Sequence, residues 1–292
     1  MSNRDDDRDL ALLPDDDEDG QEEIDPAFYA NGGIIFNEDE LGALGELTGL
    51  RVLHLTWGCS EESPSLANMG AIVTEVGDDG TTAGLATAAG LSIEFVEDDP
   101  GGLSMAFRES RAFDVVYSGY GALDWVTDFD DWASGIADVL VPGGKLVIYD
   151  EHPFSYVFDS DERGRLTVTN SYFGDYGDDS GGEFDDEDED DDLDEDDAPE
   201  PVIEREGPFT IVDNTVDEDD EEEDPGDQGD QGWTLGDLFG ALGTHGLVVK
   251  DLQEFRTSER YETPLDRLVG EVDGFDLDRV PSALLVVAVK PG

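Results

Sequence analysis

Apolar runs that alternate with helix-compatible stretches between residues 50 and 150 constrain the fold of this chain most. Five of the runs are apolar on both faces, as strands buried in a parallel sheet must be. They cover Arg51–Thr56, Ala71–Val76, Ser92–Val96, Phe113–Tyr117 and Leu146–Tyr149. Between them, three stretches fit helices: Ser63–Met69, Thr81–Ala89 and Asp130–Val141. This order predicts βαβ units and an α/β fold with a mostly parallel sheet.

The alternation stops after Phe173. From Gly174 to Gly232 the chain is dominated by two acidic blocks, Glu183–Glu200 and Asp217–Asp230. Such blocks cannot bury enough apolar surface to order themselves, so we expect a largely disordered insertion at about 174–232. Folded sequence resumes at Trp233. It offers a helix at Leu235–Leu242 and strands at Leu247–Phe255 and Ser282–Lys290.

The domain organisation follows from these shifts in composition. Residues 1–25 are acidic and poor in apolar side chains, and we expect a disordered tail there. We expect residues 26–292 to form one domain, because the elements beyond the insertion are needed to complete the sheet. No run approaches 18 apolar residues and the N-terminus lacks an apolar signal region, so we expect no membrane segment and a cytoplasmic protein. Cys59 is the only cysteine, which leaves no disulfide framework and no thiolate zinc site.

The net charge of -62 is extreme and comes from 77 acidic against 15 basic residues. Acidic surfaces can attract basic proteins or mimic nucleic acid, or they can belong to an organism that lives in saturated salt. At 1 M salt the Debye length is roughly 3 Å, so self-repulsion is screened and carboxylates hold water and cations. Because acids occur in every surface segment and lysine is nearly absent, we favour the halophilic explanation. Hydrated monovalent cations then accompany the surface, and we expect no nucleic-acid partner.

Three segments together point to a family. They read "LHLTWGCSEESPSLANMGAIVTEVG", "FDVVYSGYGALDWVTDFDDWASGIADVLVPGGKLVIYDEHPF" and "WTLGDLFGALGTHGLVVKDLQEF". From about Phe28 to Lys290 the chain resembles class I S-adenosylmethionine-dependent methyltransferases of the small-molecule type, with degenerate cofactor motifs. The resemblance implies a Rossmann-like, seven-stranded, mostly parallel sheet with helices on both faces and an antiparallel last strand.

The resemblance also implies where S-adenosyl-L-methionine would bind. The cofactor would lie across the carboxyl ends of the first strands, at the switch in strand order. Ser60 stands where the family has a glycine, and Gly77 stands where it has the carboxylate that binds the ribose, a role that Asp78 could take over. Asp99, or Asp98 if the register slips by one residue, would accept from the adenine amine. The implied cofactor-binding residues are Thr56, Gly58, Ser60, Asp78, Asp99 and Ser118.

On the methyl-transfer side, Tyr120 and His152 are the candidates for contacting the acceptor. A histidine titrates near neutrality and can act as a general base. His152 could equally form a structural hydrogen bond before the turn at Pro153. Methyl transfer itself depends mainly on the alignment of nucleophile and methyl group. No metal is implied.

Four other residues have structural interpretations. Asp128 is expected to cap the helix that follows it, since its carboxylate can accept from free backbone amides. Trp125 and Trp132 are expected in the core or in a pocket wall. His54 lies within the first strand and is expected to be a satisfied core histidine.

The sequence therefore predicts a methyltransferase with a modified cofactor site and an unknown, small-molecule acceptor. An alternative from another class is a non-catalytic, methyltransferase-like protein that has lost cofactor binding and acts through its surface or its acidic insertion. A third interpretation keeps the sheet but binds a different nucleotide. The glutamates in "GCSEES" disfavour it, because they would repel phosphates. The oligomeric state is open.

Overall fold

A computed structural model of the protein describes residues 25–57, 61–77, 81–110, 112–160, 166–168, 170–173, 232–258 and 280–292. The predicted tail (apart from Asp25), the predicted insertion apart from Gly232, and the site residues Gly58, Ser60 and Asp78 lie outside the described residues. The expectations for them stay predictions.

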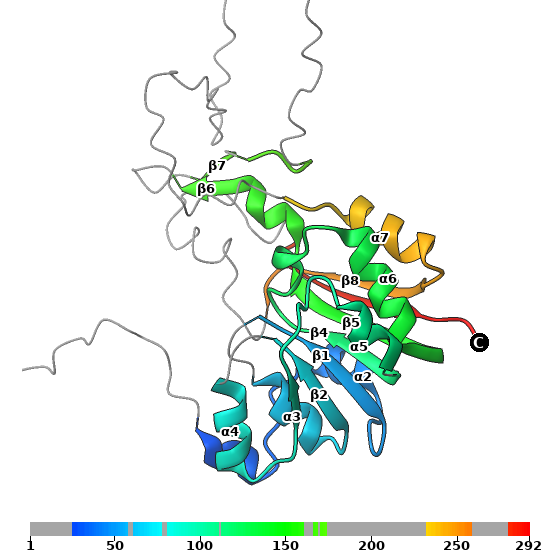
Figure 1. Cartoon of the computed structure of the whole chain (residues 1–292). Helices are drawn as coiled ribbons and strands as arrows, with labels where there is room; N and C mark the ends of the chain where they lie inside the picture. Colours follow the sequence, from blue (N-terminus) through cyan, green and yellow to red (C-terminus); the bar gives the residue numbers. More distant parts are fainter. Residues whose placement is uncertain are drawn as a thin grey trace, which may run out of the picture.

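A seven-stranded sheet forms the centre of the molecule (Figure 1). Its strand order is β3-β2-β1-β4-β5-β9-β8. Strands β1 to β5 run parallel to one another, and β9 is antiparallel to both of its neighbours. The predicted seven-stranded, mostly parallel sheet with an antiparallel last strand is confirmed. The strands are β1 (Arg51–Leu55), β2 (Ile72–Val76), β3 (Glu94–Val96), β4 (Phe113–Ser118), β5 (Leu140–Glu151), β8 (Val248–Phe255) and β9 (Ala283–Val289).

Helices cover both faces of the sheet, and each face has its own apolar core (Figure 1). Helices α5, α6 and α7 bury Phe107, Trp132 and Leu238 against one face. Helices α2 and α3 bury Leu44 and Leu66 against the other face. The helices are α1 (Pro26–Ala30), α2 (Glu38–Leu44), α3 (Glu62–Asn68), α4 (Thr81–Ala89), α5 (Met105–Ser110), α6 (Phe129–Val139) and α7 (Leu235–Thr244).

Smaller elements follow β4 and β5. A 3-10 turn, η1 (Leu123–Trp125), follows β4, and a second, η2 (Pro153–Val157), follows β5. The chain then forms a hairpin of β6 (Phe158–Ser160) and β7 (Leu166–Val168) beyond the sheet (Figure 1). In the part of the chain that the structure describes, no helix is long and apolar enough to cross a bilayer.

The junction of α6 and β5 differs from the expectation. The sequence predicted a helix to Val141 and a strand only from Leu146, with the turn residues Pro142 to Gly144 between them, whereas α6 ends at Val139 and β5 begins at Leu140. Gly143 has a φ of 84°, and its N–H donates to the carbonyl of Lys290 at 2.8 Å. This hydrogen bond joins the segment to the end of β9. The pairing register between β4 and β5 also shifts at this segment. The turn is thus absorbed into the sheet as an irregularity.

The fold brings distant segments to one edge of the sheet. Because β1 to β5 are parallel, their carboxyl ends meet at the same edge. Strand β8 is antiparallel to β9, which is itself antiparallel to β5, so β8 also ends there. From β1 the chain moves outward to β2 and β3, and then returns to place β4 on the other side of β1. This reversal of strand order makes the edge between β1 and β4 the expected ligand position.

Candidate functional site

The loops after β1 and β2 approach each other closely at Thr56 and Gly77. Thr56 is buried, and its N–H donates to the carbonyl of Val76 at 3.2 Å. A Cβ added at Gly77 would lie 2.8 Å from the carbonyl oxygen of Thr56. Gly77 is therefore needed for space, and it is not among the glycines with positive φ.

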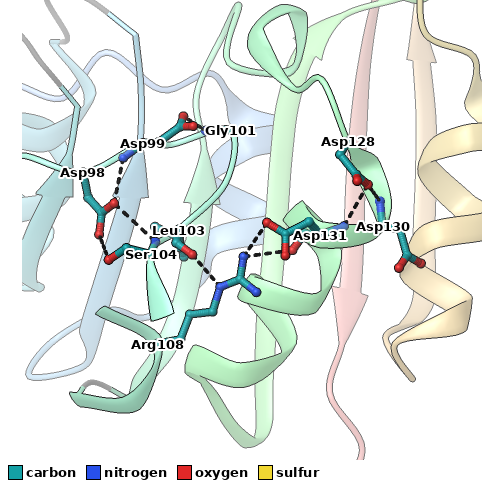
Figure 2. A network of polar contacts seen from close by, with 9 residues as sticks. All are labelled: Asp98, Asp99, Gly101, Leu103, Ser104, Arg108, Asp128, Asp130 and Asp131. Carbon is teal, nitrogen blue, oxygen red and sulfur yellow. Dashed lines mark hydrogen bonds and ion pairs between the residues drawn. The ribbon is translucent and has the colours of Figure 1, made fainter. Parts of the chain in front are cut away.

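The two aspartates after β3 have different surroundings (Figure 2). Both oxygens of Asp98 are used, because they accept from the N–H of Asp99 and from the N–H and hydroxyl of Ser104 at 2.7 to 3.2 Å. Asp99 uses only Oδ1, which accepts from the N–H of Gly101 at 2.8 Å. Among the described residues, none donates to Oδ2 of Asp99. The geometry favours Asp99 over Asp98 as the ligand-facing carboxylate.

Two tryptophans stack beside Asp99. The rings of Trp57 and Trp125 lie 4.8 Å apart at an interplanar angle of 28°, and Trp125 is 49% exposed. A Cβ on Gly101 would meet the carbonyl oxygen of Trp125 at 2.7 Å and Oδ1 of Asp99 at 3.3 Å. The loop after β3 and the turn after β4 are therefore in direct contact. Trp125 forms part of an open wall, while Trp132 is 2% exposed and belongs to the core.

Arg108 and Asp131 brace this edge from α5 and α6 (Figure 2). The guanidinium of Arg108 donates to the carbonyl of Leu103 at 2.6 Å and to the carboxylate of Asp131 at 2.8 Å. Asp128 accepts from the N–H groups of Asp130 and Asp131 at 2.9 and 3.0 Å, which confirms the predicted helix cap. These contacts are structural and fix the loop that carries Asp99.

Two buried polar atoms at the switch point have no hydrogen-bond partner among the described residues. They are the indole Nε1 of Trp57, just after β1, and the hydroxyl of Ser118, the last residue of β4. Ser118 is fully buried and lies in register with Leu55 of β1. A buried polar group without a partner costs about 1–3 kcal/mol. Such groups are rare in folded proteins, and each one suggests a missing ligand or water.

A buried polar network lies under this edge, on the face that α2 and α3 cover. His54 donates or accepts at both ring nitrogens, with Glu62 at 2.9 Å and Ser63 at 2.8 Å. Its Nδ1 is also 3.5 Å from Glu75, which we treat as a charge contact because that oxygen has no hydrogen-bond partner. The hydroxyl of Tyr117 donates to a carboxylate oxygen of Glu40 at 2.8 Å. The interpretation of His54 as a satisfied core histidine is confirmed.

His54 carries a positive charge in this network. Its burial lowers the pKa, but the hydrogen bond that it donates to Glu62 and the contact with Glu75 outweigh burial and raise the pKa to about 9. Gly119 packs directly against the network. A Cβ there would overlap Oε2 of Glu62 and lie 2.9 Å from Nε2 of His54. Sequence reasoning missed Glu62, although its place directly after the first loop was a signal.

At the carboxyl end of β5, buried Asp150 holds the turn that follows β4. Its carboxylate accepts from the N–H groups of Gly121 at 2.7 Å, Leu123 at 2.9 Å and Glu151 at 2.8 Å. Burial raises the pKa of Asp150 well above the ordinary value, against these three donors, which lower it. Asp150 thus fixes the segment that carries Tyr120.

Tyr120 donates its phenol hydrogen to Glu151. Burial, followed by the charge of Glu151, raises the pKa of the Tyr120 phenol, so the group stays neutral. The hydroxyl of Tyr156 lies 2.7 Å from Glu151 and 2.5 Å from Asp124. A phenol has one hydrogen, so Tyr156 can donate to only one of these carboxyl groups. Enclosure of its carboxyl group raises the pKa of Asp124, although the residue has an exposed side.

His152 has both ring nitrogens engaged. Nδ1 accepts from the N–H of Phe154 at 3.1 Å, so Nε2 carries the hydrogen and donates to Glu254 at 3.0 Å. Burial lowers the pKa of His152, and the charge of Glu254 only partly offsets this. The imidazole is therefore neutral near pH 7 and points its N–H at Glu254. Sequence reasoning missed Glu254, which lies 102 positions away in the chain.

A cavity of about 310 Å³ opens beside this pair. The end of β8, the start of α2 and β5 form its walls. The lining residues are Asn37, Asp39, Tyr149, Glu254, Phe255, Arg256 and Thr257. We call it the β8 groove. The fold thus brings together Thr56, Asp99, Ser118 and Tyr120 along one edge, and places His152 on its far side next to the β8 groove.

Comparisons with known proteins find similarity in structure only. No family model matches the chain, and no curated protein sequence matches it. An S-adenosylmethionine-dependent methyltransferase from Mesorhizobium loti is similar at a TM-score of 0.48 and 20% identity, covering 85% of this chain and 94% of that one. A putative methyltransferase of the same kind from Listeria monocytogenes has a TM-score of 0.48 at 17% identity, over 87% and 97% of the two chains. A TehB-like methyltransferase from Corynebacterium glutamicum reaches 0.44 at 14% identity, over 90% and 92%.

Proposed function

We propose that the chain is an S-adenosyl-L-methionine-dependent methyltransferase that acts on a small-molecule acceptor. The observation that carries the proposal is the pair of unpartnered buried atoms, Nε1 of Trp57 and Oγ of Ser118, at the switch point of the sheet. Ligands of open α/β sheets bind at this place. Neither atom is accessible to solvent, so neighbouring side chains would have to move for a ligand to reach them. Oδ2 of Asp99 and the half-exposed ring of Trp125 on the same edge fit the cofactor that the sequence motifs imply.

The roles of the residues follow from their surroundings. Oδ2 of Asp99 would accept from the adenine amine, since Oδ1 is already held by Gly101. The exposed face of Trp125, beside Asp99, offers a flat surface for a base to stack on. A carboxylate at position 77 does not fit against Thr56, so the ribose would need another acceptor, for which Asp78 is the proposal.

The acceptor side would be formed by Tyr120 and Glu151. When bound, the cofactor supplies an electrophilic methyl group on its sulfonium. The neutral phenol of Tyr120 donates and does not act as a base, because its pKa is raised. The carboxylate of Glu151 accepts hydrogen bonds from Tyr120 and Tyr156 on this side. These residues orient the acceptor, and orientation supplies most of the catalysis in methyl transfer.

Calorimetric titration of S-adenosylmethionine and S-adenosylhomocysteine in multimolar KCl tests the proposal. The wild type should bind both. Asp99→Asn keeps the oxygen that Gly101 needs but presents an amide hydrogen to the adenine amine, so it should weaken binding roughly tenfold. Asp138→Asn, an exposed change on α6, is the matched control and should leave binding unchanged. If the wild type bound neither compound, the non-catalytic alternative would replace this proposal.

A further inference from the structure

The β8 groove has the size and position of a second ligand site. Its volume of about 310 Å³ lies at the lower end of the range of small-molecule pockets. It opens at the carboxyl edge, because Tyr149 is near the end of β5 and Glu254 and Phe255 are the last residues of β8. Tyr149, Glu254 and Phe255 lie in the segments that carry the resemblance, but no lining residue of the groove was assigned a role from the sequence.

The floor of the groove is rigid and aromatic. Tyr149 is 1% exposed, and its ring packs 6.1 Å from the ring of Phe255. Its hydroxyl is paired with that of Ser258 at 3.0 Å. Tyr149 closes the base of the groove, and the partly exposed ring of Phe255 is the aromatic surface that an apolar body or an attached cation of a ligand can contact.

The walls of the groove favour a positive charge. Among the described lining residues, Asp39 and Glu254 are carboxylates and Arg256 is the one cationic side chain. The net charge of -62 over the whole chain further disfavours an anionic ligand. Charge complementarity therefore selects a cation.

Glu254 is held in a defined orientation. The N–H of His152 donates to its Oε1 at 3.0 Å, while the other ring nitrogen of His152 is fixed by Phe154. The Glu254 side chain is 50% exposed, so its second oxygen can meet a ligand. His152 follows Glu151 directly, and the groove is thereby adjacent to the acceptor side described above. His152 acts here as a positioning residue for Glu254.

We propose that the β8 groove binds the ammonium-bearing end of the methyl acceptor, a small molecule whose charge is held by Asp39 and Glu254 and whose nucleophile reaches the side formed by Tyr120 and Glu151. That the bound molecule is the methyl acceptor rests on the proposed methyltransferase function. The binding of an ammonium compound in the groove stands independently of it. The aromatic floor receives the apolar body of the molecule, and the carboxylates receive its charge.

Three probes of one shape test the charge preference: phenethylammonium, phenethyl alcohol and phenylpropanoate. Their dissociation constants are measured by ligand-observed NMR in multimolar KCl, where screening suppresses unspecific attraction to the acidic surface. Phenethylammonium should bind about tenfold tighter than the alcohol, and phenylpropanoate most weakly. Equal binding of the three probes, or tightest binding of the anion, would overturn the proposal.

Matched variants localise the effect. Glu254→Gln keeps an oxygen that can accept from His152 but removes the negative charge. Asp39→Asn likewise removes a negative charge, at the α2 wall of the groove. Each should weaken phenethylammonium about tenfold and leave the alcohol unchanged. Asp251→Asn removes an exposed charge from the same strand, outside the groove, and should change nothing. If Asp251→Asn weakened the ammonium probe as much as Glu254→Gln did, the attraction would be that of the whole surface and the groove proposal would fall.

Calorimetry with S-adenosylhomocysteine on the same variants separates the two proposals. The nucleoside should bind the wild type, Asp39→Asn and Glu254→Gln alike. Binding of the nucleoside without ammonium selectivity would refute the groove proposal alone. Ammonium selectivity without nucleoside binding would refute the methyltransferase and leave the groove as a binding site of another function.

Discussion

Gly77 illustrates how a residue that departs from an expected motif can be explained by space. The carbonyl oxygen of Thr56 lies 2.8 Å from where its Cβ would be, and a backbone atom cannot move aside as a flexible side chain can. The aspartate that the resemblance implies at this position would bring the same Cβ. Restoring it would strain the contact between β1 and β2, and so we do not expect it to tighten cofactor binding.

Gly77→Ala should therefore lower the free energy of unfolding by about 1–3 kcal/mol, as overpacking does elsewhere. Gly84→Ala is the matched control. Gly84 lies exposed in α4 with no heavy atom within 4 Å of an added Cβ, so alanine there should stabilise by about 0.5–1 kcal/mol. Denaturant unfolding in high KCl measures both. Equal effects of the two substitutions would show that the close approach at Thr56 is absent in solution.

The raised pKa of His54 in the folded protein predicts that the free energy of unfolding depends on pH. Four groups contact its ring from three elements: Glu62 and Ser63 from α3, Glu75 from β2 and Tyr117 from β4. Its pKa of about 9 in the folded protein lies above the ordinary value of 6.5. The stability it contributes is thus fully present below about pH 6.5 and is lost as the pH rises through about 9.

Wild-type stability should accordingly fall by on the order of 3 kcal/mol between about pH 6 and pH 9.5. Surface carboxylates with ordinary pKa values near 4 are ionised throughout this window and add no slope. His54→Gln keeps a polar side chain but cannot titrate, so its unfolding free energy should be lower at pH 6 and nearly flat. A slope that survives in His54→Gln would assign the pH dependence to other groups, such as Asp150.

The seven strands of the sheet were predictable from sequence, whereas the short helices α1, α2 and α5 were not. Strands β1 and β4 are apolar on both faces because helices cover both, and such runs stand out in any composition. Helices α1 and α5 have only five and six residues, too few for a helical period to show. Helix α2 is just as short, and its capping box between Asn37 and Glu40 was its only local signal.

The candidate site was predictable in outline, for a related reason. Motif order places Thr56, Asp99, Ser118 and Tyr120 at one edge, and the structure brings them there. The partners of these residues depend on tertiary contacts that no local pattern records. Glu254, for example, reaches His152 only because β8 ends beside β5 through their shared neighbour β9.

Two of the three lysines serve the ends of helices. Lys145 donates from β5 to the last carbonyls of α2, those of Ala43 and Leu44, at 2.6 and 2.8 Å. Lys290 donates to the carbonyls of Ala137 and Leu140 at the end of α6 at 2.6 and 2.8 Å. A cation at a helix C-terminus satisfies free carbonyls and opposes the helix dipole. At these two positions the lysine side chain therefore stabilises the end of a helix.

The charge of the molecule as a whole has no such local compensation. The sequence has 77 acidic residues and 15 basic ones, and several of the latter are used internally, as Lys145, Lys290 and Arg108 are. The remaining carboxylates repel one another across the surface. The Debye length is about 10 Å at 0.1 M salt and about 3 Å at 1 M, so the repulsion between neighbouring side chains is largely screened only at high salt.

The thermal midpoint should therefore rise steeply with KCl and be lowest at low salt. Tetramethylammonium chloride at the same ionic strength separates two causes, since it screens equally but its cation holds no hydration shell that carboxylates can share. If screening alone acts, the two salts should give the same midpoints. If hydrated monovalent cations are partners of the acidic surface, as we propose, KCl should stabilise more at every concentration. Sucrose, which is excluded from the surface but carries no charge, is the control for unspecific stabilisation. A midpoint independent of KCl, or raised as much by sucrose as by KCl, would contradict the halophilic explanation and return the acidic surface to a role in binding basic partners.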